Sequence, residues 1–429
     1  YFGSQYVHKS TDRGESWTII SPDLTTNDTT KQMQHESGGL TMDATGAENF
    51  TTILAIEPSP VEENVIWVGT DDGNIQVTTD GGQSWTNTAS NVKGVPAGSY
   101  VAQVKASRFN AGEAVAVINN YRRGDWTPYV LHTTNYGKKW TNIVEGKGLE
   151  GYALSFVQDL VEPNLMFVGT EFGLYFTIDG GDSWTKWTNG YPTVSTYDMV
   201  IHPREHDLVI ATFGRSFWVM DDIRPLRELA AEGLDELEKP IKAFDSPDAY
   251  LAVWRQAMGS RFAADGMYSG DNRPSGAMIT YSVNKSLAKK ESKGGSSPAA
   301  SGRWGRRSNE EAVKVAIYDE NGTNVRNLEV TPEHNGINRM QWGLERKGME
   351  RPSRRPARPN MPESRGGDVL PGTYKVVMSY AGAKDSTMVT VHYDPRIEMP
   401  MEALVATAAL EDEAGMLGAE LAKAVQSLV

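Results

Sequence analysis

The sequence predicts an all-β chain that opens with repeated small sheets and continues into a β-sandwich and a terminal helix. The main observation is a repeat. Residues 66–85, IWVGTDDGNIQVTTDGGQSW, hold two expected strands joined by a tight turn at 71–73. A close copy covers 166–184, and a degenerate copy covers 115–140. The second observation is that 42 of the 429 residues are glycine, as a turn-rich chain requires. Repeats of a few short strands with turn signals are typical of β-propeller blades.

Each copy ends in a turn of the pattern Ser/Thr-x-Asp-x-Gly-x-x-Trp, called the Trp-terminated turn below. The aspartate side chain can accept hydrogen bonds from its own turn, glycine supplies a positive φ, and tryptophan packs back on the sheet. This motif is the Asp-box, or bacterial neuraminidase (BNR) repeat. Because the turn uses the carboxylate, we expect a structural role for the motif residues, which are Asp12, Trp17, Asp80, Trp85, Asn135, Trp140, Asp179 and Trp184.

The spacing of these turns predicts successive blades of a propeller. The acidic or amide positions recur after 68, 55 and 44 residues, against the ~40–50 residues of a four-stranded blade with its loops. The longest interval contains the polar segment 23–48, which we expect to be a long loop. Residues 1–224 then give about three full blades and two partial ones. Since the chain opens within a blade, we expect it to be the C-terminal portion of a longer protein with a seven-bladed ring.

The second half of the chain has strand patterns but no Trp-terminated turn. After a helical connector at 225–242, residues 243–395 predict an immunoglobulin-like β-sandwich. Two insertions near 289–308 and 346–367 combine Gly, Ser and Pro with arginine and indicate flexible loops. The alternative is a basic patch for an acidic polymer, formed by Arg303, Arg306, Arg307, Arg351, Arg354, Arg355 and Arg358. The sandwich strands are expected at 277–283, 313–319, 338–344, 372–379 and 385–392.

Residues 396–429 predict a C-terminal helix with one apolar face, because apolar residues recur at a spacing of three and four. We expect this face to pack on the sandwich or on a partner helix. The alternative is an oligomerisation helix. The face is formed by Leu410, Ala414, Leu417, Leu421, Val425 and Leu428.

The composition narrows the class of protein. The formal net charge of −13 disfavours nucleic acid as a partner. No apolar run approaches the ~20 residues needed to span a bilayer, so we expect no transmembrane segment in this portion. With no cysteine, the chain has no disulfide and no thiolate ligand. His202 and His206 share one loop without a third ligand in view, so we expect no metal and no cofactor.

Several segments together resemble a known family. They are TGAENFTTILAIEPSP, VIWVGTDDGNIQVTTDGGQSWTN, PNLMFVGTEFGLYFTIDGGDSWTKW and VIHPREHDLVIATFGRSFWVMDDIRPLREL in the blades, and LPGTYKVVMSY in the sandwich. The chain resembles large bacterial proteins of Bacteroidetes-type genomes, described as sortilin-like or Asp-box-repeat, glycosyl hydrolase-like propeller proteins. The resemblance covers essentially the whole chain and implies an extracytoplasmic location, periplasmic, cell-surface or secreted. One departure is Phe213, where relatives commonly have histidine.

A ligand site is expected at one face of the propeller. The turn after each second strand and the loop into each first strand meet there, and the Trp-terminated turns lie at the opposite rim. Acids, arginines and aromatic rings on one face suit a polar ligand or a carbohydrate. The expected ligand-binding residues are Asp71, Arg122, Arg123, Phe172 and Arg215 from the turns, and Glu48, Tyr100, Tyr152 and Tyr197 from the loops.

Two functions from different classes fit this face. We favour a non-catalytic binding protein whose ligand is a protein, a peptide or a glycan, with an envelope complex as a further partner. The alternative is a glycoside hydrolase, with Asp72 and Glu171 as its two catalytic carboxyls. Against the alternative, Asp72 is also a good turn former, and Arg215 can pair with Asp221 or Asp222. A sialidase is disfavoured, because the sequence has no Phe/Tyr-Arg-Ile-Pro segment.

Overall fold

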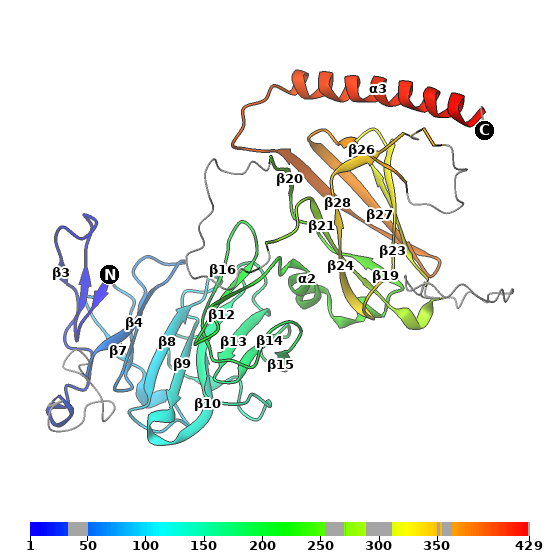
Figure 1. Ribbon diagram of the computed structural model, residues 1–429. Coiled ribbons are helices and arrows are strands. Elements are labelled where there is room, and N and C mark those ends of the chain that lie inside the picture. The colour runs from blue at the N-terminus through cyan, green and yellow to red at the C-terminus, as the bar shows by residue number, and fades with distance from the viewer. Residues whose placement is uncertain are drawn as a thin grey trace. The chain divides into compact units, whose positions relative to one another are not determined.

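A computed structural model describes residues 1–32, 50–253, 270, 272–288, 311–349, 352–353 and 363–427. The chain divides into two compact units, Tyr1–Ala231 and Glu232–Val429 (Figure 1). Glu48 lies outside the described residues, as do most of the two insertions with the seven arginines of the expected basic patch.

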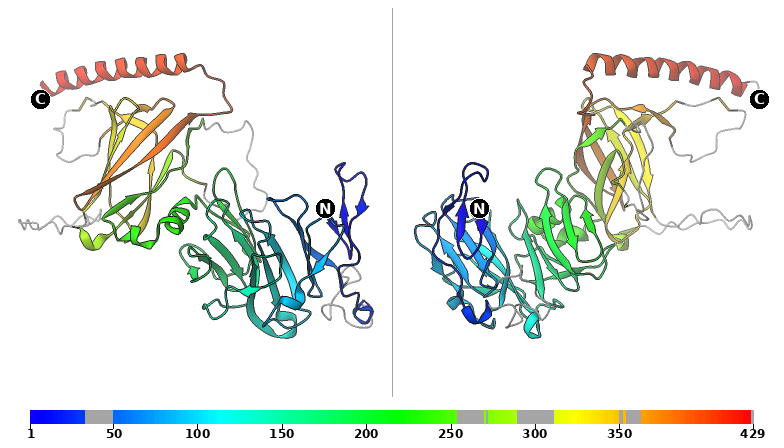
Figure 2. Two further views of the ribbon diagram at one scale, coloured as in Figure 1. Left: turned by 180° about the vertical axis from the view of Figure 1, so that it is seen from behind. Right: turned by 60° about the vertical axis from the view of Figure 1, so that its left-hand side comes forward.

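The first unit contains five antiparallel sheets that follow one another along the chain (Figures 1 and 2). In the described residues the second, third and fourth sheets have four strands, and the first and fifth have three. The expected three full blades and two partial ones are therefore confirmed. The strands are β1 (Phe2–Gly3), β2 (Val7–Lys9) and β3 (Thr18–Ile19); β4 (Ile53–Pro58), β5 (Ile66–Thr70), β6 (Ile75–Thr78) and β7 (Thr86–Asn87); β8 (Tyr100–Ala106), β9 (Ala114–Asn120), β10 (Asp125–Thr133) and β11 (Thr141–Asn142); β12 (Ala153–Gln158), β13 (Met166–Thr170), β14 (Gly173–Thr177) and β15 (Thr185–Trp187); and β16 (Thr196–Ile201), β17 (Leu208–Thr212) and β18 (Phe217–Met220).

Neighbouring sheets of this unit pack face to face on apolar side chains. The first strands of successive sheets contact one another, β4 with β8, β8 with β12, and β12 with β16. Trp67 of β5 packs with Val101 and Leu131 of the third sheet, and Phe167 of β13 packs with Ile210 of the fifth. Because both faces of each inner sheet are covered, β5, β9 and β13 are buried along their whole length. Their sequences are accordingly apolar without alternation.

The four Trp-terminated turns lie in four different sheets. In the second sheet, Asp80 accepts hydrogen bonds from the Thr78 hydroxyl at 2.8 Å and the Ser84 backbone N–H at 2.9 Å. Hydrogen bonds from Ser84 lower the pKa of Asp80 to about 2, so this carboxylate is ionised and committed to its turn. The same two bonds recur at Asp12, Asn135 and Asp179.

Three of the four tryptophans also join their sheet to the preceding one. The indole N–H of Trp85 donates to the Ile20 carbonyl at 3.1 Å, that of Trp140 to the Thr88 hydroxyl at 3.2 Å, and that of Trp184 to the Ile143 carbonyl at 3.0 Å. Each acceptor lies three residues after the tryptophan of the preceding turn. Trp17 instead donates within its own turn, to the Gly14 carbonyl at 3.2 Å, and its side chain is 48% exposed.

The second unit is a β-sandwich. One sheet has the order β19-β21-β24 and the other β20-β28-β27-β22-β23, and residues of both form one core that includes Tyr281, Trp342, Val315 and Val389. The strands are β19 (Ile241–Ala243), β20 (Ala249–Leu251), β21 (Ala277–Val283), β22 (Val313–Tyr318), β23 (Asn324–Val330), β24 (Gly336–Trp342), β25 (Glu345–Lys347), β26 (Arg365–Asp368), β27 (Gly372–Tyr380) and β28 (Ala383–Tyr393). Two helices precede the sandwich in the chain, α2 (Arg224–Glu232), which belongs to the first unit except for its last residue, and the 3-10 helix η4 (Leu234–Glu238) of the second unit.

The ends of the second insertion form a hairpin and not a loop. Here the prediction was wrong, because β25 and β26 pair at Glu345 with Asp368 and at Lys347 with Arg365. Glycines 366 and 367 lower the strand propensity of this segment, which hides it from sequence patterns. The strands β19 and β20 are three residues long, too short to show an alternating pattern.

The C-terminal helix α3 (Met401–Ser427) has the expected length but not the expected orientation. Arg346 binds Asp412 at 2.8 and 2.9 Å and Glu411 at 3.2 Å, and Leu404 and Ala408 line a cavity of about 390 Å³ against the sandwich. The expected apolar face points elsewhere, with Leu410, Leu417 and Leu421 between 57% and 67% exposed. Packing of that face on the sandwich was therefore a wrong prediction. Leu428 lies outside the described residues.

The all-β fold of propeller blades, a β-sandwich and a terminal helix is confirmed by these sheets. Within the part of the chain that the structure describes, no helix is both long and apolar enough to cross a bilayer.

Candidate functional site

One end of the first unit collects the turns that were expected to bind a ligand. In the second to fifth sheets the start of the first strand pairs with the end of the second, as in Ile53 with Thr70 and Thr196 with Thr212. The turn that follows the second strand is bonded there. The backbone N–H of Glu171 donates to the Tyr152 carbonyl at 3.1 Å, and equivalent bonds start from Asp71 and Phe213. We call this end, comprising residues 71–73, 97–100, 120–126, 150–152, 171–172, 195–197 and 213–215, the entry face.

A row of aromatic rings crosses the entry face from the third sheet to the fifth. The Tyr121 ring stacks on Tyr152 with centroids 4.5 Å apart, and Trp126 lies 5.5 Å from Tyr152. In the fifth sheet, Tyr197 and Phe213 lie 6.5 Å apart. Trp126, Tyr197 and Phe213 are 55%, 60% and 76% exposed, so their faces are open to a ligand. We call Tyr100, Tyr121, Trp126, Tyr152, Tyr197 and Phe213 the aromatic row.

Asp72, predicted as one catalytic carboxyl, is buried and accepts three hydrogen bonds from other residues. It accepts hydrogen bonds from the Thr26 backbone N–H at 2.6 Å, the Thr26 hydroxyl at 2.7 Å and the Thr70 hydroxyl. Only 4% of the residue is exposed. Its contacts are those of a residue that fixes the 71–73 turn against the segment preceding the second sheet.

The neighbouring Asp71 is buried as well. Its carboxylate accepts hydrogen bonds from the Thr52 backbone N–H at 2.9 Å and the Thr52 hydroxyl at 3.1 Å. Burial raises the pKa of Asp71 to about 6, because the charged form loses solvation that these hydrogen bonds only partly replace. Asp71 is therefore ionised at neutral pH and takes up a proton in mildly acidic solution.

Glu171, the second predicted catalytic carboxyl, lies in the fourth sheet and interacts with two hydroxyls. The Ser195 hydroxyl donates to it at 2.9 Å. Burial and the hydrogen bond to Glu171 raise the pKa of Tyr152, so the phenol stays protonated and remains a donor. Asp72 and Glu171 share no hydrogen-bond partner among the described residues.

The arginines of the entry face differ in their contacts. Arg123 holds the turn together, donating to the Ala97 carbonyl at 2.9 Å and to the Ser99 hydroxyl at 3.1 Å. Arg122 places its guanidinium 4.3 Å from the Tyr100 ring centroid and 4.7 Å from that of Tyr121. Arg215 is exposed. Neither Arg122 nor Arg215 forms an ion pair with any residue that the structure describes.

The expected pairing of Arg215 with Asp221 or Asp222 is not found. Asp222 is buried and binds Arg224 at 2.6 Å instead. Arg224 is the first residue of α2, only two positions after Asp222, so its guanidinium lies within reach of that carboxylate. Phe172, the remaining turn residue, is 44% exposed at the edge of the fourth sheet.

The two histidines considered for a metal belong to a loop at the opposite end of the fifth sheet. His202 accepts from the backbone N–H of Glu205 at 3.0 Å, and His206 lies 3.4 Å from the Arg227 guanidinium. Across the described ranges, no group of three or more His, Cys, Asp or Glu side chains is placed to hold a metal ion.

Sequence reasoning missed three residues that shape the entry face. Tyr121 and Trp126 flank the predicted Arg122-Arg123 pair, and two aromatic residues so close to a predicted turn were a signal that could have indicated them. Thr26 lies in the segment expected to be loop, 46 residues before Asp72, and no local pattern relates the two.

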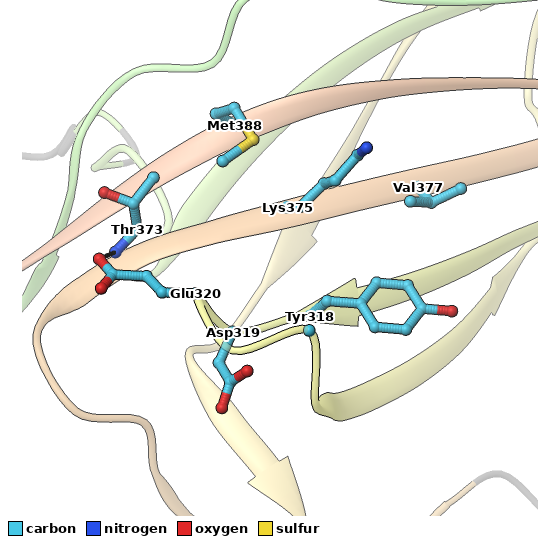
Figure 3. Close-up of a pocket in the computed structure, with 8 residues that line it drawn as sticks. Tyr318, Asp319, Glu320, Thr373, Lys375, Val377 and Met388 are labelled. Atoms are coloured by element: carbon cyan, nitrogen blue, oxygen red, sulfur yellow. Dashed lines mark hydrogen bonds between the residues drawn. The ribbon is translucent and has the colours of Figure 1, made fainter.

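A second hollow lies on the outer surface of the five-stranded sheet of the second unit. It has a volume of about 620 Å³ and includes Tyr318, Lys375 and Met388, which lie in one row across β22, β27 and β28 (Figure 3). At its end Glu320 accepts a hydrogen bond from the Thr373 backbone N–H at 3.0 Å. No residue predicted to bind a ligand lies in this hollow.

Comparisons with known proteins add structural neighbours only. No family model and no curated protein matches the chain. Among solved structures, YCF48 from Cyanidioschyzon merolae has 18% identity over 39% of this chain and 56% of its own, with a TM-score of 0.27. The GH74 xyloglucanase from Xanthomonas campestris has 12% identity over 50% of this chain and 33% of its own, with a TM-score of 0.35. The Niastella koreensis GH74 enzyme has 13% identity over 48% and 30%, with a TM-score of 0.33. At these scores the similarities carry no argument about function.

Proposed function

We propose that this protein binds an extracytoplasmic ligand, a protein, a peptide or a glycan, on the entry face without chemically changing it. One observation carries the proposal. The carboxylates of this face accept hydrogen bonds from the protein's own donors, while three of its aromatic rings, Trp126, Tyr197 and Phe213, and two of its arginines are exposed. Exposed aromatic rings and arginines are the side chains that most often dominate binding energy.

Hydrolysis of a glycoside would need two carboxyls that reach the substrate, one of them a general acid with a raised pKa. Asp72 and Asp71 are only 4% and 2% exposed, and both keep their bonds to threonines. A glycosidic oxygen would have to displace those threonines to reach either acid. The raised pKa of Asp71, about 6, is the single observation that favours the hydrolase as the second candidate.

Binding and hydrolysis are separated by one screen of the full chain against an array of glycans, peptides and proteins, with product analysis for every glycan that binds. We expect binding without product. In a ligand-binding assay, Trp126→Ala should weaken binding about tenfold, a loss of ~1.4 kcal/mol. Phe109→Ala is the matched control, because Phe109 is 39% exposed in the turn at the opposite end of the third sheet.

The hydrolase is tested on the same protein with Asp72→Asn, Asp71→Asn and Glu171→Gln. If product forms and one of these substitutions abolishes it while binding persists, the non-catalytic proposal is wrong. If product forms in all three variants, hydrolysis occurs but these three carboxyls do not catalyse it. An extracytoplasmic location, proposed from the family resemblance, is tested by fractionation of cells that produce the protein.

A further inference from the structure

We infer that the ligand of the entry face is an acidic polysaccharide, whose carboxylate or sulfate group binds the guanidinium of Arg122, with Arg215 as a second cation. The inference rests on the proposed function and specifies the ligand class of that site. It joins three observations: the charges left unpaired on the face, the position of Arg122, and the spacing of the exposed rings.

The first observation is that two arginines of the entry face have no acidic partner among the described residues. The acids around this end are held by bonds within the protein, and Glu150 is the one among them that is paired with a cation in the described residues. Asp125 accepts from the Tyr129 hydroxyl at 2.8 Å, Glu150 binds Lys186 at 2.8 Å, and Asp198 accepts from the Gln103 amide at 3.0 Å. In contrast, Arg122 and Arg215 are exposed and form no ion pair with the residues that the structure describes. An anionic ligand that meets this face therefore finds two guanidiniums that no acidic side chain of the described residues occupies.

The second observation is that Arg122 is held in place by aromatic rings. Its guanidinium contacts the Tyr100 and Tyr121 rings at 4.3 and 4.7 Å, and Tyr121 is in turn stacked on Tyr152. Ring contacts hold a guanidinium without using its N–H groups in an ion pair. Five N–H donors in a planar fork then remain for a carboxylate or sulfate, which a guanidinium can bind with two parallel hydrogen bonds. Less entropy is lost on binding, because the side chain is already ordered.

The third observation favours a sugar chain over an acidic peptide. Exposed rings lie on the same face as Arg122, Trp126 in the third sheet and the Tyr197–Phe213 pair in the fifth. A pyranose ring presents a flat face of C–H groups that packs on the electron-rich face of an aromatic ring. Sugars of one chain can therefore stack on these rings while an acidic sugar of the same chain meets Arg122. An acidic peptide has the charge but no repeated flat faces.

The net charge of the chain shapes the expected affinity. At −13, the protein as a whole does not attract a polyanion over long range. Binding must come from short-range contacts at the face, so added salt should weaken it only modestly. An interaction driven by diffuse charge would instead be abolished by salt.

The test is isothermal titration of the full chain with four probes: a galacturonate oligosaccharide, its methyl ester, a heparin-derived sulfated oligosaccharide and a poly-glutamate peptide. We expect at least one of the two acidic sugars to bind, and the ester to bind about tenfold more weakly than the galacturonate if the carboxylate is the recognised group. Arg122→Gln should reduce binding of the acidic sugar about tenfold or more. Arg122→Lys should restore part of it, because lysine keeps the charge but cannot bind bidentately. Arg204→Gln is the matched control, since Arg204 is an exposed arginine at the opposite end of the fifth sheet.

Each outcome decides between the two proposals. If neutral and acidic sugars bind equally and Arg122→Gln has no effect, the acidic-ligand inference is overturned and the binding function stands. If only poly-glutamate binds and depends on Arg122, the ligand is an acidic peptide and the polysaccharide assignment is wrong. If no probe binds and the wider screen finds no ligand sensitive to Trp126→Ala, the entry face is not a binding site and both proposals are lost.

Discussion

Arg227 of α2 donates two hydrogen bonds to the carboxylate of Asp159, at 2.8 and 2.7 Å, across 68 residues of sequence. The Asp159 side chain is completely buried, and it also accepts from the backbone N–H groups of Val161 and Glu162. These bonds outweigh the cost of burial and lower the pKa of Asp159 below its ordinary value. The contact fastens α2 to the loop that follows β12 of the fourth sheet.

Arg227→Met should destabilise the first unit by about 3–5 kcal/mol, because it leaves the Asp159 charge buried with backbone partners only. The folded-state pKa of Asp159 lies below its unfolded value, so the stabilisation is present above that unfolded value and is lost as the pH falls through the folded one. Denaturant unfolding followed by tryptophan fluorescence at pH 7 and pH 3 measures both effects. Arg204→Met is the control for loss of an exposed arginine. A loss below 1 kcal/mol at pH 7 would show that the contact is not a stabilising one.

Trp140→Ala should lower the free energy of unfolding by about 3–5 kcal/mol. The tryptophan is buried, packs edge-on against Trp67 with ring centroids 5.9 Å apart, and donates a hydrogen bond to the Thr88 hydroxyl. Trp17→Ala removes the equivalent residue of another turn, where the side chain is half exposed and its indole bonds within the turn. That variant should lose much less stability. Equal losses in thermal unfolding of the two variants would contradict the role assigned to the contact between sheets.

Asp71→Asn should raise the melting temperature at pH 7 by about 2–4 °C, the shift that ~1 kcal/mol produces in a domain of this size. The folded pKa of about 6 lies above the unfolded value near 3.8, so the folded state holds the proton more tightly. Stability from this group is therefore greatest at acidic pH and declines as the pH rises through that interval. Asparagine never ionises, so the difference between variant and parent should grow from pH 4 to pH 7. A constant difference across that range would refute the raised pKa.

Arg346→Ala should loosen α3 while leaving the sandwich folded. The arginine binds Asp412 and Glu411 of the helix, and these exposed pairs contribute ~1 kcal/mol or less each. We expect faster amide hydrogen exchange in Met401–Ser427 and unchanged exchange in β27 and β28. Lys347→Ala serves as the control, since Lys347 pairs with Glu363 and not with the helix. Unchanged exchange in the helix would show that other contacts hold α3.

The parts of the fold that depend on local chemistry could be predicted from the sequence. A turn such as Thr78–Trp85 carries its own hydrogen-bond partners within eight residues, so its pattern is visible in the chain. The same locality explains why the number of sheets expected in residues 1–224 was correct.

The parts that depend on distant contacts could not be predicted. The hydrogen bonds of Asp72 come from Thr26, and the rotation of α3 is set by Arg346, which lies 65 residues before Glu411. Similarly, Arg122 is oriented by Tyr100 of another strand, which the adjacent Arg122-Arg123 pair does not reveal.

The repeated indole bond between neighbouring sheets has a consequence for how this architecture can change. Each of the three bonds joins the same two positions of consecutive repeats, at Trp85 with Ile20, Trp140 with Thr88 and Trp184 with Ile143. A segment that runs from one point of a repeat to the equivalent point of the next contains one tryptophan donor and one acceptor. If it were inserted elsewhere in the array, it could form the indole hydrogen bond with the sheet on each side. A blade of this unit could therefore be duplicated or exchanged by recombination, and the neighbouring blades would keep their indole hydrogen bonds.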